Sequence, residues 1–127
     1  MKNKEIELCT LFNSRMKELI YKTSTILKTE HYIQLFDNLV AANNKVPLEQ
    51  FTYHILPERD RIKNKDENYF LNEFRIEDEN ITPDIETQID FIKNIFKETN
   101  SDIKKCTWQY LKLLVSISED YVVYKST

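Results

Sequence analysis

The chain has 127 residues, carries a formal net charge of −3 and contains no glycine; 41% of its residues are hydrophobic and 31% are charged. This length suits one domain over residues 1–127 with a single core, and the acidic balance disfavours a general binder of nucleic acid. Without glycine, the glycine-rich phosphate loops, the dinucleotide fingerprint and the nucleophile elbow are excluded, and all-β folds with tight hairpins are disfavoured.

Apolar residues at helical spacing predict a first helix over residues 4–23, with a polar stretch at 23–25 that interrupts or loosens it. The residues expected to face the core are Ile6, Leu8, Cys9, Leu11, Phe12, Met16, Leu19 and Ile20. A second helix over residues 29–42 is predicted to stop at Asn43 and Asn44, because asparagine is the next-best residue after glycine for a left-handed C-cap.

Pro47 suits the first turn of a short third helix, in which Leu48, Phe51 and Ile55 recur at helical spacing. Pro57 is predicted to close that helix. Residues 58–80 are the least regular part of the chain, and we expect one or two short helices there, wrapped across the bundle and followed by a solvated acidic loop.

Residues 82–86 form the clearest helix start, because Thr82 can cap, Pro83 fits the first position and two acids complement the helix dipole. A last helix is predicted over residues 102–121 with two apolar stripes. The stripes are Ile103, Cys106, Tyr110, Leu114 and Ile117, and Trp108, Leu111, Val115 and Val122. The prediction is therefore an all-α fold, a compact bundle of five to six helices around a buried C-terminal helix.

Cys9 and Cys106 lie in apolar helical patterns, and we interpret them as free thiols of a reducing compartment. A disulfide between packed terminal helices is the alternative. The cysteines and histidines are not clustered in the sequence as they are in a zinc site, and neither a metal nor a cofactor is predicted. A charged start and the lack of an apolar run of about 20 residues predict an intracellular protein that is neither secreted nor inserted in a membrane.

Two arrangements could carry chemistry. His31 and His54 each have a carboxylate nearby in sequence, which leaves a small enzyme as one alternative, although nothing in their spacing makes such groups converge. The densest basic segment, with the aromatic residues that follow it, comprises Arg59, Arg61, Lys63, Lys65, Tyr69 and Phe70. It could bind phosphates and stack bases, anchor a protein partner, or form a self-neutralised helix face, because four acids within residues 58–67 cancel its charge.

Two stretches resemble a pattern in small uncharacterised proteins of large nucleocytoplasmic DNA viruses, of the mimivirus and phycodnavirus groups. The first runs over residues 47–72 and includes Leu56-Pro57, Lys65-Asp66-Glu67 and Phe70-Leu71-Asn72. The second is the tryptophan-tyrosine-leucine helix at residues 108–114. The resemblance implies a helical viral protein of unassigned role and supplies no catalytic residues.

Together these patterns predict a non-enzymatic protein-interaction or structural protein of viral origin, either a virion component or a factor that binds host or viral proteins. A protein partner or a homo-oligomer is expected, in the host cytoplasm, the viral factory or the virion. The alternative is a nucleic-acid-associated factor that uses the basic segment from Arg59 to Lys65.

Overall fold

A computed structural model describes residues 3–27, 30–74, 83–97 and 101–126, and all the regular structure in these ranges is helical. The elements are α1 (Lys4–Leu27), α2 (Glu30–Ala42), α3 (Val46–His54), the 3-10 turn η1 (Leu56–Glu58), α4 (Arg59–Lys63), the π-helical turn η2 (Tyr69–Glu73), α5 (Pro83–Lys97) and α6 (Ser101–Lys125). The prediction of an all-α protein is confirmed for these residues. None of these helices has a stretch long and apolar enough to cross a bilayer.

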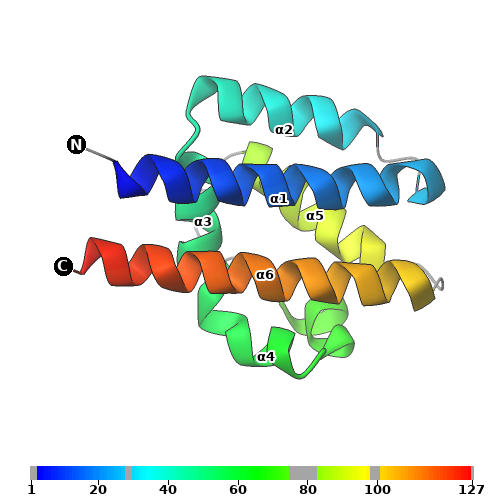
Figure 1. Ribbon diagram of the computed structural model, residues 1–127. Coiled ribbons are helices and arrows are strands. Elements are labelled where there is room, and N and C mark those ends of the chain that lie inside the picture. The colour runs from blue at the N-terminus through cyan, green and yellow to red at the C-terminus, as the bar shows by residue number, and fades with distance from the viewer. Residues whose placement is uncertain (1–2, 28–29, 75–82, 98–100, 127) are drawn as a thin grey trace.

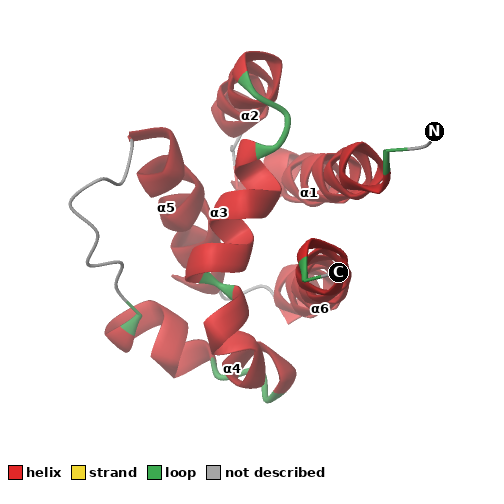
Figure 2. Cartoon of the chain, turned by 90° about the vertical axis from the view of Figure 1, so that its left-hand side faces the viewer, coloured by secondary structure: helices red, strands yellow, loops and turns green. Residues whose placement is uncertain are grey.

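The two longest helices, α1 and α6, lie side by side and antiparallel. The N-terminal end of α1 and the C-terminal end of α6 therefore lie at the same end of the pair (Figure 1). Seen along their axes, they form one outer layer, with α2 beside α1, α4 beside α6, and α3 and α5 behind (Figure 2). No other helix in the described part of the chain lies over the outward side of this pair. The architecture therefore has one uncovered face, formed by the outward sides of the antiparallel helices α1 and α6.

The first helix is longer than predicted, because it continues through residues 23–25 to Leu27. Thr23 stays inside the helix since its buried Oγ1 donates to the carbonyls of Leu19 and Ile20, each at 3.1 Å. The core face was wrong at two positions: Ile6 is 48% exposed and Leu11 40% exposed. Both residues lie on flanks of α1 that no neighbouring helix covers, which periodicity alone does not reveal.

The second helix ends at Ala42, next to the predicted stop, but without a left-handed cap. Among the described residues, positive φ is found at Lys65 and not at Asn43 or Asn44. Asn43 instead accepts the backbone N–H of Lys45 on its Oδ1 at 3.0 Å, as in an Asx-turn. Asn13 of α1 donates from Nδ2 to the Asn44 carbonyl at 2.9 Å, which fixes this turn to the bundle.

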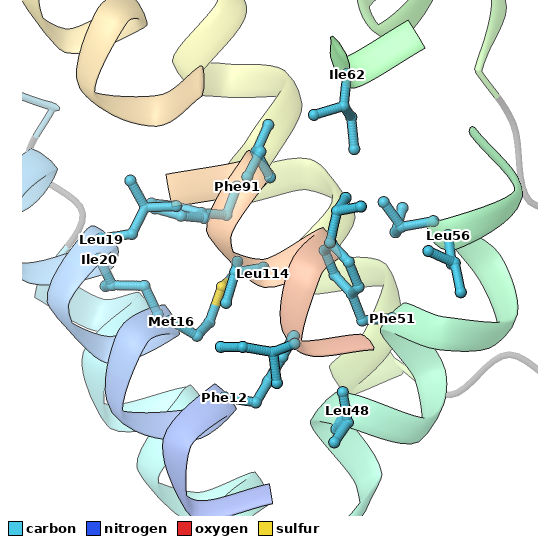
Figure 3. Close-up of a cluster of buried hydrophobic side chains, with 14 of the residues drawn as sticks. Phe12, Met16, Leu19, Ile20, Leu48, Phe51, Leu56, Ile62, Phe91 and Leu114 are labelled. Carbon is cyan, nitrogen blue, oxygen red and sulfur yellow. The ribbon is translucent and has the colours of Figure 1, made fainter. Parts of the chain in front are cut away.

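The core is centred on α6. Leu114 has no exposed surface and lies between Phe12 and Met16 of α1 on one side and the residues of α3 and α5 on the other (Figure 3). A second cluster joins the rings of Phe70, Phe96 and Trp108, with centroids 4.6 to 6.2 Å apart. Such ring pairs add to the burial of their apolar area.

The last helix extends from Ser101 to Lys125 and packs against α1, α3, α4, α5 and η1, but it is not enclosed. Its outward residues, among them Gln109, Leu113 and Ser116, are exposed. The predicted stripes were wrong where they included Val122, which is 40% exposed. They also missed three buried residues, Thr107, Ser118 and Tyr121. The hydroxyls of Thr107 and Ser118 can be buried because they donate hydrogen bonds to the carbonyls of Ile103 and Val115, one turn earlier on the helix.

Candidate functional site

The basic segment is divided by the fold among different surroundings. Arg61 is occupied within its own segment: Nη1 donates to Asp66 Oδ2 at 2.7 Å, and the guanidinium lies over the Tyr69 ring, 4.3 Å from its centroid. The hydrogen bond from Arg61, followed by one from the Tyr69 backbone N–H, lowers the pKa of Asp66. Burial and a hydrogen bond with Glu58 raise the pKa of Tyr69. These charges therefore satisfy one another rather than an incoming ligand.

Lys65 and Phe70 have structural surroundings as well. Lys65 has φ 53° and follows α4, and the N–H groups of Lys65 and Asp66 donate to the carbonyls of Ile62 and Arg61, at 3.0 and 2.8 Å. This is the Schellman arrangement at a helix end, in a position that normally favours glycine. Phe70 is 3% exposed and belongs to the ring cluster of the core, so it offers no surface for stacking.

Arg59 and Lys63 line a cleft of about 360 Å³ between α4 and α6. Ile62 and Val115 supply its apolar wall, and the remaining lining residues are Asp60, Lys112 and Glu119. None of these five charged side chains forms an ion pair within the described ranges. Sequence reasoning found two of the three cations but missed Lys112, because it comes from a helix about 50 residues further along the chain.

The outer layer presents a second candidate surface. A shallow groove of about 400 Å³ between α1 and α6 is lined by Arg15, Glu18, Gln109, Tyr110 and Leu113. On α1, Tyr21 lies three residues after Glu18 and ten after Leu11. On α6, Val123 lies three residues after Asp120 and ten after Leu113. With this spacing, the three side chains of each helix share its outward side.

We call this surface the α1/α6 face. Its residues are Leu11, Arg15, Glu18 and Tyr21 on α1, and Gln109, Leu113, Ser116, Asp120, Val123 and Tyr124 on α6. Five of them are large apolar or aromatic residues that are between 36% and 64% exposed: Leu11, Tyr21, Leu113, Val123 and Tyr124. The rim is charged, and the Arg15 Nη1 lies 2.6 Å from Glu18 Oε2. This face was not predicted from the sequence, where apolar residues at helical spacing were assigned to the core.

The histidines stand in ordinary surroundings. His31 is exposed and packs against the neighbouring Tyr32 ring, with centroids 4.1 Å apart. The Nε2 of His54 lies 3.1 Å from Gln50 Oε1, one turn away on α3. Over the described residues, no three groups among histidine, cysteine, aspartate and glutamate are placed to hold a metal ion together. The carboxylates of Glu77, Asp78 and Glu79 lie outside the described residues.

Both cysteines are free, Cys9 buried and Cys106 partly buried. The terminal helices do pack together, as the disulfide alternative required, but they are antiparallel. Glu5 pairs with Lys125, and Lys22 lies over the Tyr110 ring, so Cys9 is near the Tyr121 end of α6. Cys106 is about 22 Å further along that helix axis, at 1.5 Å per residue, which is too far for a disulfide. Burial raises the pKa of the Cys9 thiol.

Comparison of the chain with protein-family models, with curated proteins and with solved structures gives no match.

Proposed function

We propose that this chain is a non-enzymatic protein-interaction or structural protein that binds through the α1/α6 face. The observation that supports this proposal is the exposure of Leu11, Tyr21, Leu113, Val123 and Tyr124 on one bare layer of two long helices. Scattered exposed apolar residues are normal on a monomer, whereas a set gathered on one surface is typical of interaction sites.

The composition of the face also fits the anatomy of binding surfaces. Tyrosine and arginine are enriched where contacts contribute most to affinity, and such contacts are surrounded by polar groups that exclude water. Here Tyr21 and Leu113 supply apolar surface, and the Arg15–Glu18 pair lies at the edge of the groove. A surface of this kind needs only side chains that pack and no reacting group.

A photo-crosslinking residue at position 113 tests this proposal directly in the cells that make the protein. The matched control places the same residue at position 34, since Gln34 is exposed on α2 away from the face. We expect a discrete protein adduct from position 113 that mass spectrometry identifies, and none from position 34. Equal labelling at both positions, or none at 113, would contradict the proposal.

A second candidate function is association with nucleic acid through the α4/α6 cleft. Arg59, Lys63 and Lys112 point to it, because three cations without ion pairs in the described ranges surround one hollow. Binding of a single-stranded oligonucleotide should weaken with salt, and the double variant Arg59→Ala, Lys63→Ala should reduce the salt slope by about 1.4. Lys65→Ala, outside the cleft, is the control. No binding at low salt would remove this candidate.

The viral resemblance remains a prediction. If it holds, the bound protein is a virion component or a host or viral factor.

A further inference from the structure

We propose that the α4/α6 cleft binds a nucleoside monophosphate, with the phosphate between Lys63 and Lys112 and the base toward Arg59 and Glu119. The proposal rests on the second candidate function and deepens it, because it narrows the ligand of the same cleft from a strand of nucleic acid to one nucleotide. Three observations carry it: the direction of α4 against α6, the charges that this direction places at each end of the cleft, and the acids that bound it.

The direction of α4 relative to α6 follows from contacts on either side of it. Before α4, burial and then the charge of Glu49 on α3 raise the pKa of Tyr121, so Glu49 lies near the C-terminal part of α6. After α4, Glu67 Oε1 lies 2.5 Å from the Nζ of Lys104, near the N-terminal end of α6. The chain between these two contacts therefore runs antiparallel to α6, and Figure 1 shows the same direction.

This direction gives the two ends of the cleft different charges. Lys63 and Lys112 lie toward one end, one on each helix, whereas Arg59, Asp60 and Glu119 lie toward the other. Neither lysine forms an ion pair in the described ranges. Two ammonium groups that face one hollow repel each other, and a dianion between them replaces that repulsion with two attractions. The phosphate of a monoester carries nearly two negative charges at neutral pH.

The acids near the lysine end do not neutralise it. Asp66 and Glu67, which follow Lys63 in the chain, already form ion pairs with other residues, at 2.7 and 2.5 Å. Glu119 is seven residues from Lys112, which is about 10 Å along α6. An anion from solution therefore fits this end, because phosphate oxygens form short charge-assisted hydrogen bonds with ammonium groups.

The rest of the lining fits the remainder of a nucleotide. Ile62 and Val115 are buried and form an apolar wall against which a base can lie. Beyond it, Asp60 and Glu119 accept hydrogen bonds from ribose hydroxyls and base amino groups, and Arg59 donates them. The charged ends are about 10 Å apart along α6, which suits one nucleotide and exceeds the length of a free phosphate. The cleft volume of about 360 Å³ lies within the range of small-molecule sites.

The surroundings of the cleft favour one nucleotide over a strand. Asp66 and Glu67 follow the lysine end, and Asp60 and Glu119 belong to the lining of the other end. Because a strand carries a phosphate on every nucleotide, its extension in either direction would place phosphates beside carboxylates. The net charge of −3 adds to this repulsion. A single phosphate meets only the lysine end.

Titration of the isotope-labelled full chain with adenosine monophosphate, followed by nuclear magnetic resonance, tests the site. We expect the amide signals of Ile62 and Val115 to shift. Lys63→Ala and Lys112→Ala should each weaken binding by about tenfold, because each removes a charge-assisted hydrogen bond to the phosphate. Lys97→Ala removes the same charge from α5 and should leave the affinity unchanged. All these lysines are exposed, and circular dichroism verifies the fold of each variant.

Two parts of the nucleotide and one further variant separate the ends of the cleft. Adenosine and inorganic phosphate should each bind at least about tenfold more weakly than adenosine monophosphate, since each engages one end alone. Glu119→Gln should weaken binding of adenosine monophosphate by about threefold and should not weaken binding of inorganic phosphate, because Glu119 contacts the base end.

Three results would overturn the inference: no shift at millimolar adenosine monophosphate, equal affinity for inorganic phosphate, or an affinity that Lys112→Ala leaves unchanged. A single-stranded oligonucleotide that binds more tightly than adenosine monophosphate would refute the single nucleotide while the second candidate function stands. If neither binds at low salt, both are refuted. The proposal for the α1/α6 face is decided separately, by crosslinking from position 113.

Discussion

The outer layer and the segment of residues 55–74 bury apolar side chains in opposite ways. α1 and α6 do so by repetition, keeping one face inward over 24 and 25 residues. The segment passes through a 3-10 turn, a short α-helix and a π-helical turn within 20 residues, yet it buries Ile62 and Phe70 almost completely. The long helices depend on the sum of many similar contacts, whereas the segment depends on a few specific ones. Substitutions should therefore have graded effects in the layer and single-residue effects in the segment.

The largest effect is expected in the layer, at the centre of the core. Leu114→Ala should lower the free energy of unfolding by about 3 kcal/mol, because it removes buried methyl groups and leaves a cavity that packed neighbours cannot fill. Leu113→Ala is the matched control on the same helix; its side chain is 41% exposed, and we expect a loss below about 1 kcal/mol. Urea unfolding measures both. Equal losses would mean that α6 does not face inward at Leu114.

Tyr121 also belongs to the layer, and its phenol should make the stability of the fold depend on pH in the alkaline range. Burial, with the negative charges of Glu49 and Glu5, raises the pKa of Tyr121 to about 12. The unfolded side chain ionises near pH 10. The neutral form therefore favours the folded state below pH 10, and this stability is lost as the pH rises from about 10 to 12.

Tyr121→Phe should remove that part of the alkaline loss, which reaches about 3 kcal/mol. The measurement is the urea midpoint at several pH values. Tyr53→Phe, at a ring that is 71% exposed, should leave the profile unchanged. Parallel profiles for all three proteins would contradict the buried position of Tyr121.

In the segment, the free-energy cost of a single backbone angle should be measurable. Lys65 holds φ 53° at the end of α4, a conformation that costs a residue with a Cβ about 1 kcal/mol more than glycine. Lys65→Gly should therefore stabilise the chain, by about 0.5 to 1 kcal/mol in urea unfolding. Asn64→Gly is the control, because Asn64 has φ −88° and glycine there should destabilise by a similar amount. Destabilisation by both would contradict the Schellman ending.

The smallest effect concerns the Arg61–Asp66 pair, which water screens. Because its pKa is lowered in the fold, the Asp66 carboxylate stabilises the chain above its ordinary pKa of 3.8, and that stability is lost as the pH falls through the folded value. Asp66→Asn should be less stable than the unaltered chain at neutral pH, and the difference should vanish in acid. Asp60→Asn, at a carboxylate without an ion pair in the described ranges, is the control. A difference that persists unchanged at low pH would contradict the pairing.

Sequence reasoning succeeded where one element decided its own structure. The helix starts at Pro47 and Pro83 followed from local chemistry that tertiary contacts did not override. It failed at Ile6, Leu11 and Val122, because whether an apolar side chain is covered depends on a neighbour from elsewhere in the chain. The candidate surfaces show the same limit. Arg59 and Lys63 were found as a basic run, but the α4/α6 cleft exists only because α6 brings Lys112 and Glu119 beside them.

By itself, the amino-acid sequence determined that the chain is helical and approximately where its helices lie, since backbone hydrogen bonds and apolar spacing are local properties. Only the tertiary structure decided which helical sides remain bare, how α1 and α6 are registered, and that Arg61 is occupied by Asp66 and Tyr69. The physical reason is that coverage, register and pairing depend on distances between residues far apart in the chain. Those distances follow from the packing of all the helices at once.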